Sequence, residues 1–160
     1  MLTAELVSRA PRAERDEPYG RELVYQVDEG EVMLAGWARE GRSAPHDHGE
    51  AHGFVIVVAG RFVETSYRFD GEELRPLASR ELAAGDVLRA APGQIHDMQA
   101  RQGGLTLHLY FPAIRAMRVY DRLARVTVRV TGACGAWLPR DAELVLERRF
   151  WDAQAGASES

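Results

Sequence analysis

Histidines at two places in the sequence have the spacing of metal ligands. His46 and His48 flank Asp47, and residues two apart in an extended strand share a face, so both imidazoles can aim at one point while Asp47 faces away. His96 ends a turn-like stretch, Pro-Gly-Gln-Ile-His at 92–96. Because neutral imidazole is the commonest nitrogen ligand in proteins, the pattern predicts a metal centre formed by His46, His48 and His96. The alternative is that these are ordinary surface or core histidines.

A second pattern lies in residues 105–110, where leucines alternate with Thr106, His108 and Tyr110. Alternation with period two predicts a strand with a leucine face and a polar face. If the leucines pack in a sheet interface, the polar face looks into a cavity, and the hydroxyl, imidazole and phenol can satisfy one another as a relay. The alternative is a strand whose polar face is simply solvated.

The rest of the chain predicts a scaffold of short strands around these residues. Short apolar runs alternate with turns centred on glycine, the pattern of an all-β sandwich or barrel. Asp70-Gly71 predicts a two-residue hairpin turn. Val126, Val128 and Val130 alternate with polar residues, as in a half-buried strand. We expect no long helix, internal repeat or interdomain linker, and at most a short helical segment within residues 1–18.

Charge and composition exclude several classes of protein. The chain has 160 residues and a net charge of −4, and its 20 basic residues are all arginines. These arginines are scattered and outnumbered by acids, so no basic stripe suggests nucleic-acid binding. The longest apolar run, residues 54–59, is far too short to span a bilayer. A single cysteine, Cys134, and the lack of a secretory signal pattern fit a reducing cytosol. We expect one cytoplasmic domain, a monomer or weak homo-oligomer, with neither nucleic acid nor membrane as a partner.

Together these motifs resemble the cysteine dioxygenase (thiol dioxygenase) branch of the cupin superfamily. The resemblance runs from about Tyr19 to Val130, some two-thirds of the chain. It implies an all-β cupin fold (a double-stranded β-helix, or jelly-roll barrel) over residues 19–150, with residues 1–18 packed on the barrel and a flexible tail, 151–160. The motifs that carry it are Tyr-Gly-Arg-Glu-Leu-Val at 19–24, Trp37 with Gly41, Ser43 and the His46-Asp47-His48 segment, Gly85-Asp86, His96, and Leu-His-Leu-Tyr at 107–110 followed by Pro112.

The resemblance implies a non-haem Fe(II) ion bound by His46, His48 and His96. The general cupin pattern has a glutamate ligand at the position of Gly53. Without it, three neutral imidazoles leave the full 2+ charge and up to three open positions, which can accept a thiolate, an amine and dioxygen together. The implied reaction adds both atoms of O2 to the sulfur of a small thiol and gives a sulfinic acid.

The resemblance also implies roles for residues around the metal. Arg21 would clamp the substrate carboxylate through its two-pronged guanidinium, with Tyr19 two residues earlier on the same strand face. Tyr110 would hydrogen-bond the substrate carboxylate or the reacting oxygen, and His108 and then Thr106 would orient it. By residue type alone Arg21 is a solvated charge, as most arginines are, and only its place in Tyr-x-Arg-x-Leu-Val distinguishes it.

The chain departs from the family beside the implied pocket. Gly53 stands where animal members carry the cysteine that forms a thioether with the tyrosine, which excludes that crosslink to Tyr110. Thr106 replaces the usual serine, and Phe111-Pro112-Ala113 replaces a double proline. The family pattern also implies a cis Phe111–Pro112 bond.

Two residues of reactive type lie outside these motifs. His52 is in the short connection after Gly49, off the strand register, and we expect it not to bind the metal. Cys134 has no histidine or basic neighbour in sequence that would lower the pKa of its thiol, so we expect a structural role.

The leading hypothesis is an Fe(II)-dependent dioxygenase that converts L-cysteine to cysteine sulfinate. A related thiol, 3-mercaptopropionate or mercaptosuccinate, is the nearest alternative. Family members that prefer 3-mercaptopropionate tend to have glutamine where this chain has Arg21, which favours cysteine. A second alternative is a cupin that binds a metal or small ligand without turnover, which would leave the Tyr110–His108 relay without a use. A sugar-type cupin isomerase or epimerase would need a general base, and its pattern is not visible here.

Overall fold

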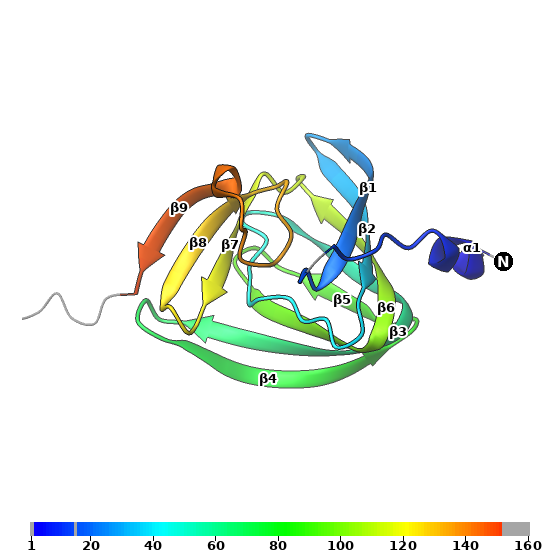
Figure 1. The fold of residues 1–160 in the computed structure, drawn as a ribbon, viewed down its shortest axis with the longest axis horizontal. Coiled ribbons are helices and arrows are strands. Elements are labelled where there is room, and N and C mark those ends of the chain that lie inside the picture. The colour runs from blue at the N-terminus through cyan, green and yellow to red at the C-terminus, as the bar shows by residue number, and fades with distance from the viewer. Residues whose placement is uncertain (1, 15, 152–160) are drawn as a thin grey trace, which may run out of the picture.

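The computed structural model describes residues 2–14 and 16–151, and nearly all of its regular structure is extended (Figure 1). The prediction of an all-β fold with a short N-terminal helix is therefore confirmed. The elements are α1 (Leu2–Ser8), β1 (Tyr19–Val27), β2 (Gly30–Trp37), β3 (His52–Phe69), β4 (Leu74–Ala83), β5 (Val87–Ala90), β6 (Ile95–Phe111), β7 (Ala116–Asp121), β8 (Val126–Thr131), a 3-10 turn (Ala142–Leu144) and β9 (Val145–Phe150).

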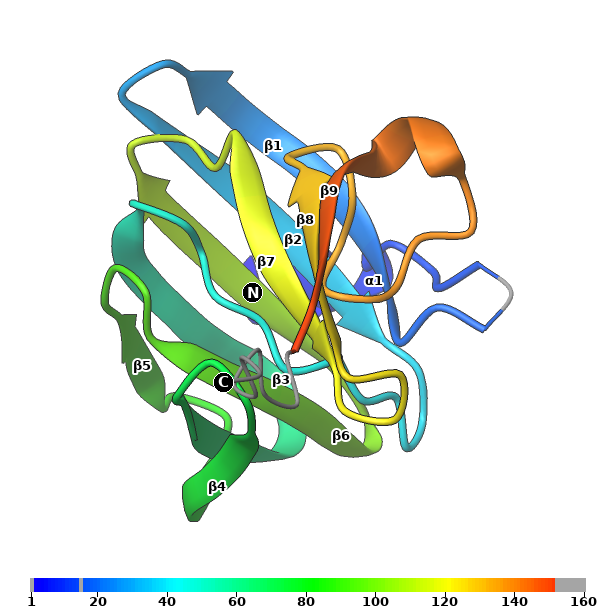
Figure 2. The ribbon, with the colours of Figure 1, turned by 90° about the vertical axis from the view of Figure 1, so that its left-hand side faces the viewer.

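The strands form two antiparallel sheets that face each other (Figure 2). The larger sheet has the order β1-β2-β6-β3-β4, and β5 also pairs with β3. The smaller sheet has the order β7-β8-β9. Alternate residues of each strand point into the space between the sheets, so both sheets contribute side chains to the interior.

The two long strands β3 and β6 position most of the interior side chains. The register of β6 against β2 sets Tyr110 opposite Glu31, and the register of β6 against β3 sets His96 opposite Ser66. Because side chains alternate, the polar residues of 106–110 all point inward and are buried, while Leu107 and Leu109 point outward and are only half-buried. The leucines therefore pack on the outer face, not in the interface between the sheets.

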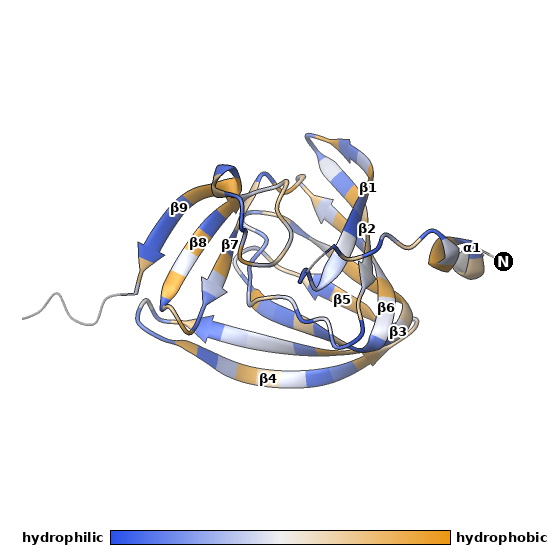
Figure 3. Cartoon of the chain, viewed as in Figure 1, coloured by the Kyte–Doolittle hydropathy of each residue, from blue (hydrophilic) through white to orange (hydrophobic). Residues whose placement is uncertain are grey.

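Strand β8 has the half-buried pattern expected from its sequence. Val126, Val128 and Val130 are buried in the core of the smaller sheet, whereas Arg129 is exposed. Figure 3 shows the corresponding bands of apolar and polar residues along this strand. The valine face closes the interior on the side opposite the large sheet.

Glycines let the N-terminal segment lie directly on the outer face of the large sheet. A Cβ atom on Gly36 would be 1.9 Å from the carbonyl oxygen of Pro11, and one on Gly20 would be 2.2 Å from that of Arg12. Helix α1 contacts β3 further along the same sheet. Neither this helix nor any other in the described residues is long and apolar enough to cross a membrane.

Two local predictions differ from the structure. The turn after β3 is not a two-residue turn, because Phe69 pairs with Leu74 and four residues connect the strands. The carboxylate of Asp70 accepts hydrogen bonds from the backbone N–H groups of residues 72 and 73 and stabilises this longer turn. Of the predicted tail 151–160, Trp151 is buried and donates a hydrogen bond to Thr127, and residues 152–160 lie outside the described part of the chain.

The aromatic core beneath the cavity gives a stability prediction. Phe62 is 1% exposed and packs edge-on against Trp37 at a centroid distance of 5.5 Å. Phe62→Ala should reduce the free energy of unfolding by about 3–5 kcal/mol, since it removes a large buried side chain and leaves a cavity. Phe150→Ala is the control, because Phe150 is 69% exposed, and it should cost less than about 1 kcal/mol. Urea denaturation measures both, and equal losses would contradict the packing described.

Candidate metal centre and its cavity

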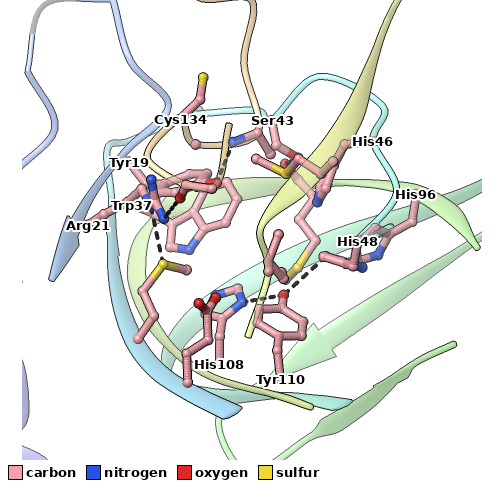
Figure 4. Close-up of a pocket in the computed structure, with 18 residues that line it drawn as sticks. Tyr19, Arg21, Trp37, Ser43, His46, His48, His96, His108, Tyr110 and Cys134 are labelled. Carbon is pink, nitrogen blue, oxygen red and sulfur yellow. Dashed lines mark hydrogen bonds between the residues drawn. The ribbon is translucent and has the colours of Figure 1, made fainter. Parts of the chain in front are cut away.

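The interior contains a cavity toward which the predicted site residues other than Thr106 converge (Figure 4). Its wall combines charged, imidazole and aromatic groups with three methionines, and both sheets contribute to it. The loop that precedes β3 supplies two histidines, and the loop after β8 closes one side. The lining residues are Tyr19, Arg21, Glu31, Met33, Trp37, Ser43, His46, His48, His96, Met98, His108, Tyr110, Ile114, Met117, Gly132, Cys134, Gly135 and Ala136.

His46, His48 and His96 meet in this cavity. Each is buried, and each offers one ring nitrogen such that the three atoms lie within 4.8 Å of one another. The His-x-His segment is not a strand, as its spacing suggested, but an irregular loop in which His46 forms an isolated β-bridge with His96. Two backbone hydrogen bonds, of 2.9 and 3.0 Å, join these two residues directly. The loop thus holds two ligands against the strand that carries the third.

The protonation of these imidazoles suits metal binding. His46 donates its Nδ1–H to the carbonyl oxygen of Ala44 at 2.9 Å, and His96 donates its Nδ1–H to Glu64 at 2.8 Å. Each bond fixes the tautomer, so that Nε2 carries the free lone pair. Burial lowers the pKa of His46 to about 3 and lowers that of His48 well below its ordinary value, so both stay neutral. Nδ1 of His48 is buried without a partner. These three residues therefore fit a divalent metal that accepts imidazole.

Glu64 contacts the histidine cluster through His96, and the sequence pattern did not indicate it. It lies on β3, is 5% exposed, and its second oxygen accepts a hydrogen bond from Arg80 at 2.6 Å. Burial alone would raise the pKa of Glu64, but the bonds from His96 and Arg80 outweigh it and hold that pKa below its ordinary value. The sequence contains one indication of its position, because Glu64 follows the buried Phe62 by two residues and residues two apart in a strand share a face. The side chain of Glu64 is therefore expected to point inward.

Two of the three histidines, His46 and His96, are each followed directly in the sequence by a buried aspartate. Asp97 accepts hydrogen bonds from Arg42 at 2.8 Å and from Tyr67 at 2.6 Å. Asp47 accepts 3.0 Å bonds from the backbone N–H groups of Gly49 and Arg118. Both aspartates are 1% exposed and point away from the cavity, so they fix the backbone on either side of the histidines.

The residues predicted to form a relay are connected in a line of hydrogen bonds. Trp37 donates its indole N–H to Thr106 at 2.8 Å, Thr106 lies 2.7 Å from Nε2 of His108, and Nδ1 of His108 lies 3.0 Å from the Tyr110 hydroxyl. That hydroxyl lies 3.1 Å from Nε2 of His48. The indole N–H of Trp37 can only donate, so the Thr106 oxygen accepts it and the Thr106 hydroxyl donates to Nε2 of His108. Nδ1–H of His108 then donates to the Tyr110 oxygen.

Burial keeps this line of groups uncharged. It lowers the pKa of His108 to about 3 and raises the pKa of Tyr110 well above its ordinary value. Tyr110 therefore remains a protonated phenol at neutral pH. Its O–H points from the relay toward the cluster of histidines.

Arg21 and Tyr19 lie at the opposite side of the cavity from β3. The Tyr19 ring packs between Trp37 and Trp137, and its hydroxyl accepts a hydrogen bond from the backbone N–H of Ala136 at 2.8 Å. Arg21 donates to the carbonyl oxygens of residues 133 and 132, at 2.7 and 3.1 Å, and to the sulfur of Met33 at 3.2 Å. The loop after β8 thereby holds the guanidinium at the cavity wall.

The remaining residues singled out in the sequence also have clear positions. His52 is exposed beside Phe111 and is not part of the cluster. Cys134 lines the cavity, and burial raises the pKa of its thiol to about 11. A Cβ atom on Gly53 would be 1.8 Å from the carbonyl oxygen of Leu109, so neither a glutamate nor a cysteine fits there without a backbone shift. The Phe111–Pro112 bond is cis.

The fold and the three-histidine site define a cupin-type metal-binding barrel. Residues 15–123 match the family model for cysteine dioxygenase type I, which covers more than half of the chain. The protein therefore belongs to the cysteine dioxygenase family of the cupin superfamily.

Solved structures support the fold independently. An uncharacterised protein with a double-stranded β-helix domain from Klebsiella pneumoniae is 18% identical, with a TM-score of 0.59 over 71% of this chain and 87% of its own. An RmlC-like cupin from Shewanella frigidimarina is also 18% identical, with a TM-score of 0.53 over 66% and 86% of the two chains. A cupin superfamily protein from Desulfitobacterium hafniense is 17% identical, with a TM-score of 0.52 over 66% and 86%. At these identities the likeness confirms the predicted cupin fold alone.

Glu64 gives a prediction for metal affinity. Glu64→Gln keeps the size of the side chain but weakens the hydrogen bond that orients His96, so the affinity for Fe(II) should fall by about 10–100-fold. Glu81→Gln is the matched control, because Glu81 is exposed on β4 and the substitution removes the same charge. Titration of metal-free protein against a competing chelator measures both. Unchanged affinity in the Glu64 variant would show that this carboxylate does not support the site.

Proposed function

We propose that the protein is an Fe(II)-dependent thiol dioxygenase that converts L-cysteine to cysteine sulfinic acid. The observation that carries the proposal is the set of three buried imidazoles without a carboxylate ligand, facing a cavity that also contains Arg21 and Tyr110. Family membership supports the same class of reaction. The choice of iron and of cysteine is the part of the proposal that needs testing.

The reaction balances without a further reductant. A thiol and O2 give a sulfinic acid, with both oxygen atoms bonded to sulfur, so the sulfur loses the four electrons that O2 gains. Bound Fe(II) would supply adjacent positions for the thiolate and O2 and the one-electron steps that this pairing requires. His46, His48 and His96 would hold it, each through a ring nitrogen.

The residues of the chain perform the binding and positioning steps. In our proposal Arg21 holds the substrate carboxylate, since three of its five N–H groups donate to the protein, and the other two have no partner among residues 2–14 and 16–151. Tyr19 supports this wall of the cavity through its bond to Ala136. The buried position of the site keeps competing water away from the reacting sulfur.

Tyr110 is the proposed proton donor to the substrate or to the reacting oxygen. In the structure its hydroxyl lies 3.1 Å from Nε2 of His48. A metal held by this nitrogen of His48 would take the place of the hydrogen bond, and the Tyr110 hydroxyl would then be free to donate to a ligand in the cavity. His108, held by Thr106, keeps the phenol in place by donating to its oxygen.

The proposal extends to the cellular setting. A thiol substrate stays reduced in the cytosol, and the single buried Cys134 is compatible with that compartment. The proposed partners are therefore a small thiol and O2. The proposed assembly is a monomer or weak homo-oligomer.

Oxygen uptake by iron-loaded protein tests the function. The protein should be loaded with Fe(II) without air and then supplied with O2 and L-cysteine, 3-mercaptopropionate or mercaptosuccinate. We expect the highest kcat/KM with L-cysteine and one O2 consumed per sulfinate formed. A higher kcat/KM with another thiol would mean that this thiol, and not L-cysteine, is the substrate. No uptake with any thiol despite stoichiometric iron would favour a metal-binding cupin without turnover.

Arg21 gives a separate prediction for substrate binding. Arg21→Ala should raise KM for L-cysteine at nearly constant iron content, by about 10–100-fold, because it removes about 1.5–3 kcal/mol of charge-assisted hydrogen bonding. The control is Arg89→Ala, which removes an exposed arginine on β5. Steady-state oxygen uptake measures KM for both. An unchanged KM in the Arg21 variant would exclude this residue from the carboxylate site.

A further inference from the structure

Three neutral acceptors hold Arg21 at the cavity wall. Its Nη groups donate to the carbonyl oxygens of residues 133 and 132, and its Nε–H donates to the sulfur of Met33 at 3.2 Å (Figure 4). Within residues 2–14 and 16–151 no acidic side chain forms an ion pair with Arg21. Neutral acceptors orient a guanidinium without cancelling its charge, so the positive charge stays available to an anionic ligand.

Of these three acceptors, the sulfur of Met33 is the one that belongs to the large sheet. Met33 lies on β2, is 5% exposed and lines the cavity. In the register of β1 against β2, Arg21 is opposite Ala35. Met33 is opposite Leu23, two residues further along β1, so Met33 and Arg21 are diagonal neighbours on the inward face. The sulfur contact therefore ties the guanidinium to the sheet, whereas the two carbonyl contacts tie it to the loop after β8.

Methionine has the properties that this contact requires. Its side chain is long and unbranched and carries a weak acceptor near its end, so the sulfur can reach the diagonal position. Leucine or isoleucine would fill a similar space but leave the Nε–H without an acceptor. A carboxylate would bind the Nε–H more strongly but would also cancel the charge. The thioether satisfies the donor and preserves the cation.

We propose that Met33 is a positioning residue that fixes the direction in which Arg21 presents its two remaining N–H groups to the substrate carboxylate. Without the sulfur contact, the guanidinium is held only by its bonds to the loop after β8 and can turn about them. The carboxylate then loses part of its two-point hydrogen bonding. The bonds that hold the histidines and the relay stay the same, because other residues form them. This role rests on the proposed function, since it concerns a carboxylate that Arg21 binds.

Steady-state oxygen uptake by iron-loaded Met33→Leu tests this role. Leucine nearly conserves the volume of methionine, so the fold and the iron content should stay close to those of the wild-type protein. We expect KM for L-cysteine to rise about three- to tenfold, the scale of one hydrogen bond, at nearly unchanged kcat. Met33→Gln restores an acceptor, so its KM should lie between the values of the wild-type protein and the leucine variant.

A double-mutant cycle separates the positioning of Arg21 from general packing of the cavity wall. In the Arg21→Ala background, Met33→Leu should change KM by less than about twofold, because the donor is already absent. An equal rise of KM in both backgrounds would show that Met33 acts through packing, and it would overturn the proposal. An unchanged KM in Met33→Leu alone would overturn it as well.

Nuclear magnetic resonance of the metal-free protein tests the contact without turnover. The Nε–H signal of Arg21 is identified by its loss in Arg21→Ala. Its exchange with water should be at least about threefold faster in Met33→Leu, since the Nε–H loses its acceptor. The Nε–H of Arg42, which donates to Asp97, is the control and should exchange at an unchanged rate.

The exchange rates also keep this role distinct from the proposed function. Equal exchange of the Arg21 Nε–H in the wild-type protein and in Met33→Leu would overturn the role of Met33 and leave the function in place. If the wild-type protein oxygenated no thiol, the proposed function would fail, and the exchange rates would still decide whether Met33 holds the guanidinium.

Discussion

Three imidazoles can hold one metal ion in a protein interior only if each turns a nitrogen lone pair to the same point. Placing three imidazole nitrogens within 4.8 Å of one another in a buried space removes them from water, and their lone pairs cannot hydrogen-bond to one another. The structure meets this constraint from outside the cavity, since the Nδ1–H groups of His46 and His96 are bound by acceptors behind them. The arrangement of the surrounding loops and strands follows from that requirement.

Buried carboxylates supply much of this outside support, and arginines compensate them. Glu64 orients His96 directly, whereas Asp47 and Asp97 fix the backbone beside the ligands. Each of the three lies beneath an arginine that remains partly in solvent. Arginine suits this role better than lysine, because its planar fork can bind a carboxylate and a second acceptor while staying charged. The all-arginine composition of the chain therefore has a structural use at these positions.

The sequence was sufficient for the features that depend on local spacing. The shared face of Thr106, His108 and Tyr110 follows from positions two residues apart in a strand. The convergence of His46 and His48 depends instead on the loop that is bridged to His96. Features that depend on pairing between distant strands could not be predicted in this way. Glu31 meets Tyr110 only through the register of β2 against β6.

The errors have similar physical causes. The His-x-His loop was expected to be a strand, yet its backbone bonds go to His96 and to residues of β7 instead of forming a continuous ladder. For residues 105–110 a leucine face packed between the sheets was one condition considered for a polar face that looks into a cavity, but alternation alone does not say which face is inside. The polar face points into the cavity, where Thr106, His108 and Tyr110 hydrogen-bond to one another.

The central claim is that three imidazoles, and no carboxylate, hold the metal and leave room for a thiolate. X-ray absorption spectroscopy of the Fe(II)-loaded protein, before and after anaerobic addition of L-cysteine, measures this directly. The account predicts scattering from three imidazoles in both samples and a new sulfur neighbour of the iron after cysteine is added. Fewer than three imidazoles, or an iron environment that gains no sulfur, would contradict it.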